Sequence, residues 1–389
     1  MRRGPNGGLI VEAPDGRSAI NALIVYLEFI DTSTAHILQA RTVLEPLAAE
    51  LVARHVSEDD VAELRFLLRN DAAEESRRAD PFHKWVGDHC ANPVVALLTD
   101  VLGVMTERYV RAPWRAPVPA VVAELQADAI GSHRAIADAV ASGDSALARV
   151  RMSDHLDAVT TILAHDPAHR APRRGPRFRD SPAGPNATLA EQLAGRMFDD
   201  ITRQGWPTGE VLGSQPELMT TYGVGRAVLR AAIRLLEIHS VAMTRRGPGG
   251  GLVVMRPDQR AGIEASSVYL SFRGTTAHDL DVVRDAIALG AVEILGRAAW
   301  PSDSKTIHEL QDAESKGVVA LQLSLVHATE NPVLCLFFDI LIDLMDRLNA
   351  GQHINRATAG DATAKARVVS ALAQHNWPLA QRRLRALHR

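Results

Sequence analysis

Cysteine and long apolar runs are both scarce in this sequence. Two cysteines, Cys90 and Cys335, are too few for a disulfide scaffold or for a zinc cluster built from cysteines. The most apolar run, Val333 to Met345, is interrupted by two aspartates and falls short of the ~18 apolar residues that span a bilayer. The N-terminal segment also lacks the apolar stretch of a secretory signal. We therefore expect a cytoplasmic protein that makes no contact with a membrane.

Lysine is rare as well, and the net charge is small. Lysine provides only four of the 43 basic residues, and the others are arginines, which suit bidentate phosphate and base contacts. Genomic base composition alone would produce the same bias. A formal net charge of −3 gives no overall electrostatic reason to expect nucleic-acid binding, so that function would have to rest on local charge. At roughly 150 residues per domain, this length predicts two to three domains.

The chain contains an internal repeat. Segments 2–15 and 245–258 are identical at ten of 14 positions. The similarity continues past these segments, and AsnProVal at 92–94 recurs at 331–333. The first-copy residues that recur directly after the repeated segment are Ile20, Ala22, Val25, Tyr26, Leu27 and Phe29. Identity of this extent indicates a tandem duplication.

Both copies have helical sequence patterns. In residues 16–165 and again in 258–389, apolar residues recur at intervals of three and four positions. Between the copies, residues 166–187 contain five prolines, five arginines and little apolar content, which predicts a linker. Its arginines could contact phosphates, but a solvated linker is the favoured interpretation.

Residues 188–257 follow a different pattern. Thr188 and Glu191 have the spacing of a capping box, which predicts the start of a helix. Two further helices are separated by Gly-Val-Gly, and two short apolar runs flank a glycine-rich tip, as in a β-hairpin. The predicted elements are helices over 188–204, 215–222 and 226–239 and strands over 241–243 and 252–255. This order is typical of a winged helix-turn-helix.

The second half of this segment is strongly basic. Six arginines and one glutamate lie between Arg226 and Arg256, a local net charge of +5. Arg226 and Arg230 lie one turn apart at the N-terminal end of the longer helix, the end that enters the major groove. Arg245, Arg246 and the glycines that follow would let the wing approach a phosphate backbone. One alternative is a nucleotide-binding loop, which the missing Gly-Lys-Ser/Thr argues against; the other is a solvated surface.

The stretch from Tyr222 to Glu237 resembles the recognition region of GntR-type transcription regulators, whose pattern is Gly-Val-Ser-Arg-x-x-Val-Arg-Glu-Ala-Leu. The resemblance implies DNA contacts by Arg226, Arg230, Gly225, Ala227, Arg245, Arg246 and Gly247. Gly225 and Ala227 replace the family's serine or threonine on either side of the first arginine, and Pro216 stands where an arginine often contacts DNA. Each lost contact would cost roughly 1–3 kcal/mol of discrimination between DNA sequences.

The flanking helical regions resemble the effector domain of FadR-type members of this family, an antiparallel bundle. The matching residues in the first copy are Arg41 to Glu45, Phe82-His83, Asn92-Pro93, His133 and His155. In many members such histidines, with an aspartate four residues before the first, bind a divalent metal that anchors a small carboxylate. The resemblance therefore implies a site for zinc or nickel.

In this sequence the implied metal ligands are His83, His133, His155 and Asp80, with Arg41 as an effector-binding residue. Residue 79 is alanine, and Asp80 is the nearest acid. One residue turns the direction of a helical side chain by about 100°. The alternative is that these are ordinary polar or core histidines among the fifteen in the chain.

The second helical copy lacks the three histidines. Alignment of the repeats places Gln322, Lys365 and Leu387 at their positions, so we expect no metal site there. Its apolar segment 334–344 is expected to pack against the equivalent segment 94–105 of the first copy.

These observations predict a mainly α protein in which two antiparallel helical-bundle domains flank one winged helix-turn-helix domain. The predicted divisions are 1–15, a remnant wing of a first DNA-binding domain; 16–165, the effector domain; 166–187, the linker; 188–257, the DNA-binding domain; and 258–389, a degenerate effector-type domain.

We expect a non-enzymatic transcription regulator, a repressor that binds a double-stranded DNA operator and responds to a small organic acid held through zinc or nickel. Because one complete DNA-binding domain is present per chain, a homodimer would be needed to read a palindrome. The two helical copies could also pack as an intramolecular pseudo-dimer. One alternative is a regulator fragment that does not bind DNA alone and serves as a sensor or heteromeric partner. A metalloenzyme is a further alternative, but no paired general acid and base accompanies the histidines.

Overall fold

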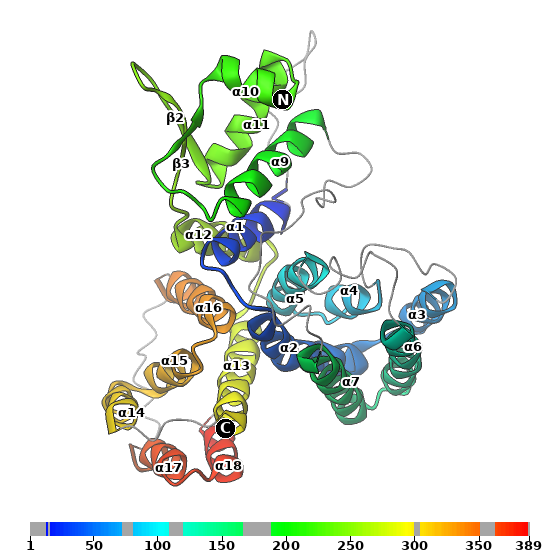
Figure 1. The fold of residues 1–389 in the computed structure, drawn as a ribbon. Helices are drawn as coiled ribbons and strands as arrows, with labels where there is room; N and C mark the ends of the chain where they lie inside the picture. Colours follow the sequence, from blue (N-terminus) through cyan, green and yellow to red (C-terminus); the bar gives the residue numbers. More distant parts are fainter. Residues whose placement is uncertain are drawn as a thin grey trace.

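The computed structural model describes residues 13–14, 16–71, 81–108, 120–165, 188–298, 304–350 and 362–387. Most of the segment predicted to be a remnant wing, the whole predicted linker and Asp80 lie outside the described residues. The described chain is mainly helical, as predicted, with one small sheet (Figure 1). Among these residues, no helix is both long and apolar enough to cross a membrane.

The first helical copy is a bundle. Its helices are α1 (Gly16–Phe29), α2 (Thr34–His55), α3 (Glu58–Asp71), α4 (Pro81–Asp88), α5 (Pro93–Thr106), α6 (Ala120–Ala141) and α7 (Ser145–His165). The most extensive helix–helix interface in this bundle is between α2 and α7, and α2 also packs against α4, α5 and α6. Helix α2 is therefore the central helix, which explains why it is almost entirely apolar along its buried length.

The second copy repeats this order, with shorter helices at its C-terminal end. Its elements are α12 (Gln259–Phe272), α13 (Ala277–Arg297), α14 (Ser304–Lys316), α15 (Val318–Ala328), α16 (Pro332–Ala350), α17 (Ala362–Ala373) and α18 (Trp377–Ala386). Helix α13 takes the central place that α2 has in the first copy, with contacts to α15, α16 and α18.

Between the copies lies a small three-stranded domain, called here the head. Its elements are α9 (Leu189–Arg203), β1 (Val211–Gly213), α10 (Gln215–Tyr222), α11 (Arg226–Ile238), β2 (Ala242–Arg245) and β3 (Gly251–Val254). The three predicted helices and the predicted hairpin are confirmed. Strand β1 was not predicted; it pairs antiparallel with β3, so the sheet order is β1-β3-β2.

The two helical copies share one hydrophobic core. Buried residues of both copies form a single cluster, and α2 packs against α13 across the boundary. Helices α16 and α5 each pack against the central helix of the other copy, α16 on α2 and α5 on α13. The expectation that segments 334–344 and 94–105 chiefly pack against each other was therefore wrong. Each apolar helix packs instead against the central helices of both copies.

Small residues in the second copy allow this close packing. A Cβ on Gly290 of α13 would come within 2.8 Å of Val43 Cγ1 on α2, and a Cβ on Gly262 of α12 would come within 2.9 Å of Leu23 Cδ2 on α1. The first copy thus supplies the larger side chain and the second copy the space for it. An interior packed at this density leaves no room for a methyl group at either glycine.

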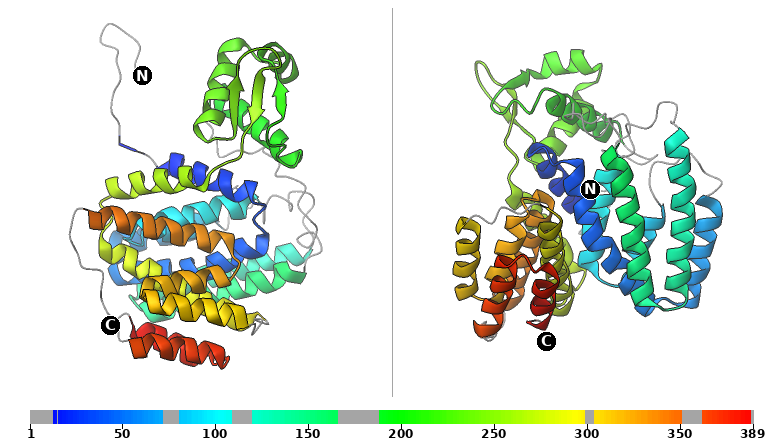
Figure 2. Two further views of the ribbon diagram at one scale, coloured as in Figure 1. Left: turned by 90° about the vertical axis from the view of Figure 1, so that its left-hand side faces the viewer. Right: turned by 60° about the horizontal axis from the view of Figure 1, so that its bottom comes forward.

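Helices α1 and α12 form an antiparallel pair (Figure 2). The Tyr26 hydroxyl donates a hydrogen bond to Gln259 Oε1 at 3.0 Å, and Tyr269 reaches Gly16, where a Cβ would lie 3.2 Å from the ring. Each tyrosine is the counterpart of the other in the repeat. The end of α1 therefore lies beside the start of α12, and the end of α12 lies beside the start of α1.

The head rests on α1 of the first copy, although the chain joins it directly to α12 of the second. Val25 of α1 is buried in the hydrophobic core of the head. Phe29 contacts the Trp206 ring edge to face, with the ring centroids 5.5 Å apart, and Trp206 contacts Phe198 of α9 at the same separation. The head can contact the first copy because it is joined to the start of α12, and in the antiparallel pair that start lies beside the end of α1.

Candidate nucleic-acid interface and metal centre

Helix α11 has a buried apolar face and an exposed basic face. Leu229, Ala232, Ile233 and Leu236 are buried in the core of the head. The arginines on the other face, Arg226, Arg230 and Arg234, are exposed. The three-to-four-residue spacing places them along one side of the helix. The predicted recognition residues Arg226 and Arg230 therefore lie together and face solvent, beside Gly225 and Ala227, which are also exposed.

The turn before α11 is built from glycine. Gly223 ends α10 with φ +64°, a left-handed conformation that other residues adopt at a cost, and its amide donates to the Met219 carbonyl. Gly225 is the N-cap of α11 and makes no side-chain capping hydrogen bond. A serine or threonine there would stabilise the helix start by a few tenths of a kcal/mol more than glycine does. The N-terminal amides of α11 consequently remain open on the same side as Arg226.

Helix α10 is anchored at both ends. At its start, the Ser214 amide donates to Glu217 Oε2 at 2.7 Å, which lowers the pKa of Glu217. At its end, the Tyr222 hydroxyl donates to Asp200 Oδ2 of α9 at 2.8 Å. Burial, reinforced by this carboxylate, raises the pKa of Tyr222 above its ordinary value. The second bond ties the end of α10 to α9.

The wing presents the other predicted residues. Arg245, Arg246 and Gly247 are all exposed at the tip of the β2–β3 hairpin. Gly247 has φ +101° and Gly249 has φ +69°, and Arg245 Nη2 donates to the Gly249 carbonyl at 3.1 Å, which closes the tip. Arg246 extends beside it. The wing and α11 are neighbouring elements of the head (Figure 1), and each carries exposed arginines.

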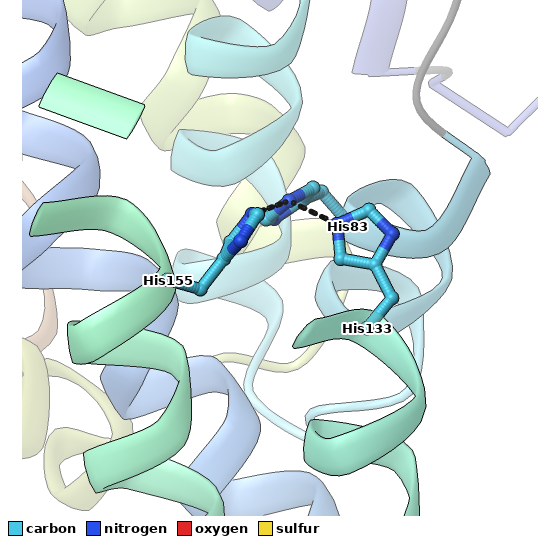
Figure 3. A group of neighbouring side chains, drawn as sticks. All are labelled: His83, His133 and His155. Carbon is cyan, nitrogen blue, oxygen red and sulfur yellow. Dashed lines mark hydrogen bonds between the residues drawn. The ribbon is translucent and has the colours of Figure 1, made fainter. Parts of the chain in front are cut away.

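The three predicted histidines meet inside the first bundle (Figure 3). His83 comes from α4, His133 from α6 and His155 from α7. His83 Nε2 lies 3.2 Å from Nε2 of His133 and 3.2 Å from Nε2 of His155. His133 and His155 are only 4% and 6% exposed. Side chains separated by up to 72 residues thus present the same ring nitrogen to a common point.

Glu45 of α2 contacts His83 through the ring nitrogen that does not face the other two histidines. Its Oε2 lies 2.7 Å from His83 Nδ1, which places the ring proton on Nδ1 and leaves the Nε2 lone pair facing the other histidines. Arg41, one turn earlier, pairs with Glu45 through Nε at 2.5 Å and Nη2 at 3.1 Å. Burial would raise the pKa of Glu45, but Arg41 and His83 outweigh it and lower the pKa to about 2.

Sequence reasoning gave no role to Glu45. The signal was present in the spacing of Arg41 and Glu45, opposite charges one turn apart among the apolar residues of α2. The resemblance assigned Arg41 to effector binding. In the structure it is 7% exposed and lies against Glu45, in the layer behind the histidines.

The donor set fits a divalent transition metal. An ion about 2.1 Å from each nitrogen, with angles of roughly 90–110°, separates its ligand nitrogens by about 3.0–3.4 Å. The two 3.2 Å separations that involve His83 fall within that range, and all three ligand nitrogens lie within 4.8 Å of one another. Three neutral imidazoles held this way, one of them oriented by a buried carboxylate, are the ligands and outer partner typical of zinc and nickel sites.

In the second copy, the residues that align with the histidines make different contacts. Gln322 is fully buried and donates to Asp285 Oδ1 at 3.1 Å. Lys365 is 8% exposed and donates to the Glu314 carbonyl at 2.9 Å. A buried ammonium group, where the first copy has His133, repels a cation. Of the described residues, only the three histidines of the first copy form a group with metal-ligand geometry.

Two family models match separate parts of the chain. The FCD domain model matches residues 36–158, which spans α2 to α7, and the model described as bacterial regulatory proteins, gntR family, matches residues 189–252, the head. Among solved structures, one titled Streptococcus agalactiae GntR shares 16% sequence identity with a TM-score of 0.39. That similarity covers 51% of this chain and 96% of the other. None of the curated proteins compared with the chain matches it.

Proposed function

Because the chain belongs to the GntR family of bacterial regulators, in the FadR-like group that carries an FCD domain, we propose that it regulates transcription from a specific operator in response to a small carboxylate. The head is a GntR-type DNA-binding domain, and residues 36–158 form an FCD effector domain. Both domains are those of regulators and not of enzymes. The operator, the acid effector and the metal are the parts that we propose.

One observation carries the DNA-binding proposal. The recognition helix α11 buries a complete apolar face and exposes Arg226 and Arg230 at its open N-terminal end. Arginine there can donate two hydrogen bonds to a guanine edge or bind a phosphate, and the wing arginines can contact the adjacent backbone. Double-stranded DNA is the partner whose charge and groove width match this arrangement.

We place the effector at the histidine centre. A zinc or nickel ion held by His83, His133 and His155 would keep open coordination positions, to which a carboxylate oxygen can bind. Glu45 fixes the tautomer of His83, and Arg41 keeps Glu45 ionised and in place. The site therefore selects a small anion by charge, inside a bundle that excludes larger molecules.

The route from this site to the head is short. Glu45 lies on α2, the helix that directly follows α1 in the chain, and α1 carries the Phe29 contact with Trp206. A change in the position of α2 on effector binding would move the surface on which the head rests. Regulation would then act through the orientation of the head.

A homodimer would let two heads read a two-fold operator. Each chain presents one described head, whereas GntR-type domains read half-sites in pairs. Sedimentation of the full chain, alone and with operator DNA, measures the number of chains in the complex directly.

DNA binding is tested with the full chain and DNA from upstream of its own gene. Arg226→Ala should weaken binding by about 1–3 kcal/mol, roughly five- to 150-fold, as measured by fluorescence anisotropy. Arg382→Ala removes the same charge from an exposed position on α18 and should leave affinity unchanged. Affinity should also fall steeply as salt is raised. Equal affinity of both variants and no salt dependence would contradict DNA binding; no binding by any form would favour a regulator fragment.

The metal is tested separately. The purified full chain should contain up to one zinc or nickel ion per chain by elemental analysis, and His133→Ala should lose it. His308→Ala, which removes an exposed histidine of α14, should retain it. A metal content that is the same in both variants would contradict the histidine site without touching the DNA-binding result.

A further inference from the structure

Helix α12 exposes an apolar face whose counterpart on α1 is covered by the head. Val268 is 58% exposed and Phe272 is 57% exposed. Both are large apolar side chains one turn apart on the same helix, and isolated exposure of one such residue would be unremarkable. Their counterparts in the repeat are Val25 and Phe29, which lie under the head. The head therefore covers this valine and phenylalanine in the first copy, whereas their counterparts in the second copy are exposed.

The head contacts α1 through a defined set of residues. Val25 is 7% exposed and belongs to the head core, and Phe29 stacks edge to face on Trp206. At the other end of the helix, Arg17 assists the Thr188 hydrogen bonds in lowering the pKa of Glu191 on α9. We call Arg17, Val25 and Phe29 the α1 face.

All three residues of the α1 face are identical in the second copy. Arg260, Val268 and Phe272 occupy the corresponding positions of α12, and we call them the α12 face. Arg260 is exposed, as the other two are. Three residues of the surface that binds the head are thus repeated, and exposed, on the corresponding helix of the second copy.

The connectivity of the chain determines to which helix a second head on the α12 face would be joined. The existing head precedes α12, whose start lies beside the end of α1, so it rests on the Phe29 end of α1. By the same geometry, a domain that precedes α1 would rest on the Phe272 end of α12, because Tyr269 lies against Gly16. Figure 2 (left) shows the head above one end of the α1–α12 pair, and no other described element stands above the opposite end.

The sequence ahead of α1 agrees with this geometry. Residues 2–15 repeat the wing segment 245–258 at ten of 14 positions, and each segment leads directly into its helix. A wing is the last part of a winged helix-turn-helix domain. Its repetition ahead of α1 identifies the kind of domain that the α12 face would receive.

We propose that the α12 face is a docking site for a second winged helix-turn-helix head, joined ahead of α1 as the existing head is joined ahead of α12. The second head would bury Val268 in its core and place an aromatic side chain against Phe272. The two heads would then be related by the pseudo-two-fold axis of the helical copies. One such chain would present two recognition helices and so read two half-sites. This goes beyond the proposed function and does not depend on which operator or effector the protein uses.

The first part of the test uses the full chain as it is. Val268→Cys and Val25→Cys are compared for their rate of alkylation by iodoacetamide at pH 8. Burial raises the pKa of Cys90 to about 11, and burial together with Asp339 does the same for Cys335, so both native thiols react slowly. The cysteine at 268 should react at least about tenfold faster than the one at 25, because reaching position 25 requires the head to open.

The second part adds the proposed occupant. The full chain is extended with a copy of its own residues 188–244 joined to Arg2, which completes a second head by the repeat. Alkylation at 268 should then slow to the rate at 25, and Phe272→Ala should restore fast alkylation in the extended chain only. Near-ultraviolet circular dichroism of the added tryptophan reports whether the second head is folded.

Three results would overturn the proposal. Fast alkylation at 268 beside a folded added head would show that the face does not receive it. An added head that stays unfolded would do the same, because the existing head folds against the same three residues on α1. Protection at 268 that rises with chain concentration in the unextended protein would assign the face to a second copy of the chain. DNA binding enters none of these measurements, so failure of the regulatory function would not be mistaken for failure of the docking site.

Discussion

Asn92 and Asn331 make the same hydrogen bond in opposite directions across the boundary between the two helical copies. Asn92 Nδ2 donates to the Asp279 carbonyl at 3.1 Å, and Asn331 Nδ2 donates to the His36 carbonyl at 3.0 Å. The residues correspond in the repeat, and so do the two carbonyls. Each side chain also caps its own helix, α5 or α16, by accepting from two backbone amides. The two copies are therefore packed as an intramolecular pseudo-dimer.

Asn92→Ala and Asn331→Ala should each destabilise the whole helical part of the chain. Loss of the N-cap costs about 0.5–2 kcal/mol, and the unmade cross-copy bond at a partly buried carbonyl adds about 1 kcal/mol. Urea unfolding of the full chain measures the sum. Asn376→Ala serves as the control, since Asn376 is exposed and caps α18 within its own copy. Equal losses in all three variants would mean that the cross-copy bonds contribute nothing.

Gly290→Ala should destabilise the interface between α2 and α13. The added methyl group would meet Val43, and overpacking of this kind costs about 1–3 kcal/mol. Val43→Ala in the same chain should recover most of that loss, as measured by urea unfolding. Gly103→Ala is the matched control. No atom outside its own helix lies within 4 Å of a Cβ there, so the change should stabilise α5 by about 0.5–1 kcal/mol.

Tyr222→Phe should destabilise the head in a pH-dependent way. Its hydroxyl bond to Asp200 contributes about 1–2 kcal/mol at pH 8. The pKa of Tyr222 is raised above 10.0 in the folded chain, first by burial and then by Asp200. The stabilisation is thus fully present below pH 10.0 and is lost as the pH rises through the folded-state pKa. Thermal unfolding of wild type and variant should show a difference that shrinks above pH 10.0; a difference that grows would contradict this assignment.

Glu45→Gln should weaken metal binding while leaving all three histidines in place. The carboxylate orients His83 and raises the basicity of its ligand nitrogen, and loss of such an outer partner typically costs about 10–100-fold in metal affinity. A competition titration with a chromogenic zinc chelator on the full chain measures the dissociation constant. Glu50→Gln, on the same helix and paired with Arg149 outside the site, should leave it unchanged. An unaltered constant in Glu45→Gln would remove the carboxylate from the site.

Much of the head could be predicted from the sequence alone. Its helices follow from capping patterns and apolar spacing, and its hairpin follows from glycines between two apolar runs. These are local signals, in which each residue reports on neighbours three or four positions away. Strand β1 escaped prediction because three residues carry too little pattern, and its pairing with β3 depends on a segment about 40 residues later.

The histidine centre was predicted in part. The resemblance singled out the three histidines, and the structure brings their Nε2 atoms together. Only the structure showed that Glu45 contacts His83, because nothing in the spacing of α2 and α4 along the chain indicates which of their side chains meet. Asp80 remains a prediction, since it lies outside the described residues.

The order of elements, the duplication and the identity of the chemical groups were already legible in the amino-acid sequence, because helical periodicity, glycine turns and repeated motifs are properties of neighbouring residues. The tertiary structure alone decided which apolar face covers which. It placed α16 on α2, seated the head on the opposite copy and left the α12 face exposed. A sequence records that a helix face is apolar, but many partners could bury that face equally well, and only the close fit of particular side chains, such as Val43 against Gly290, selects one of them.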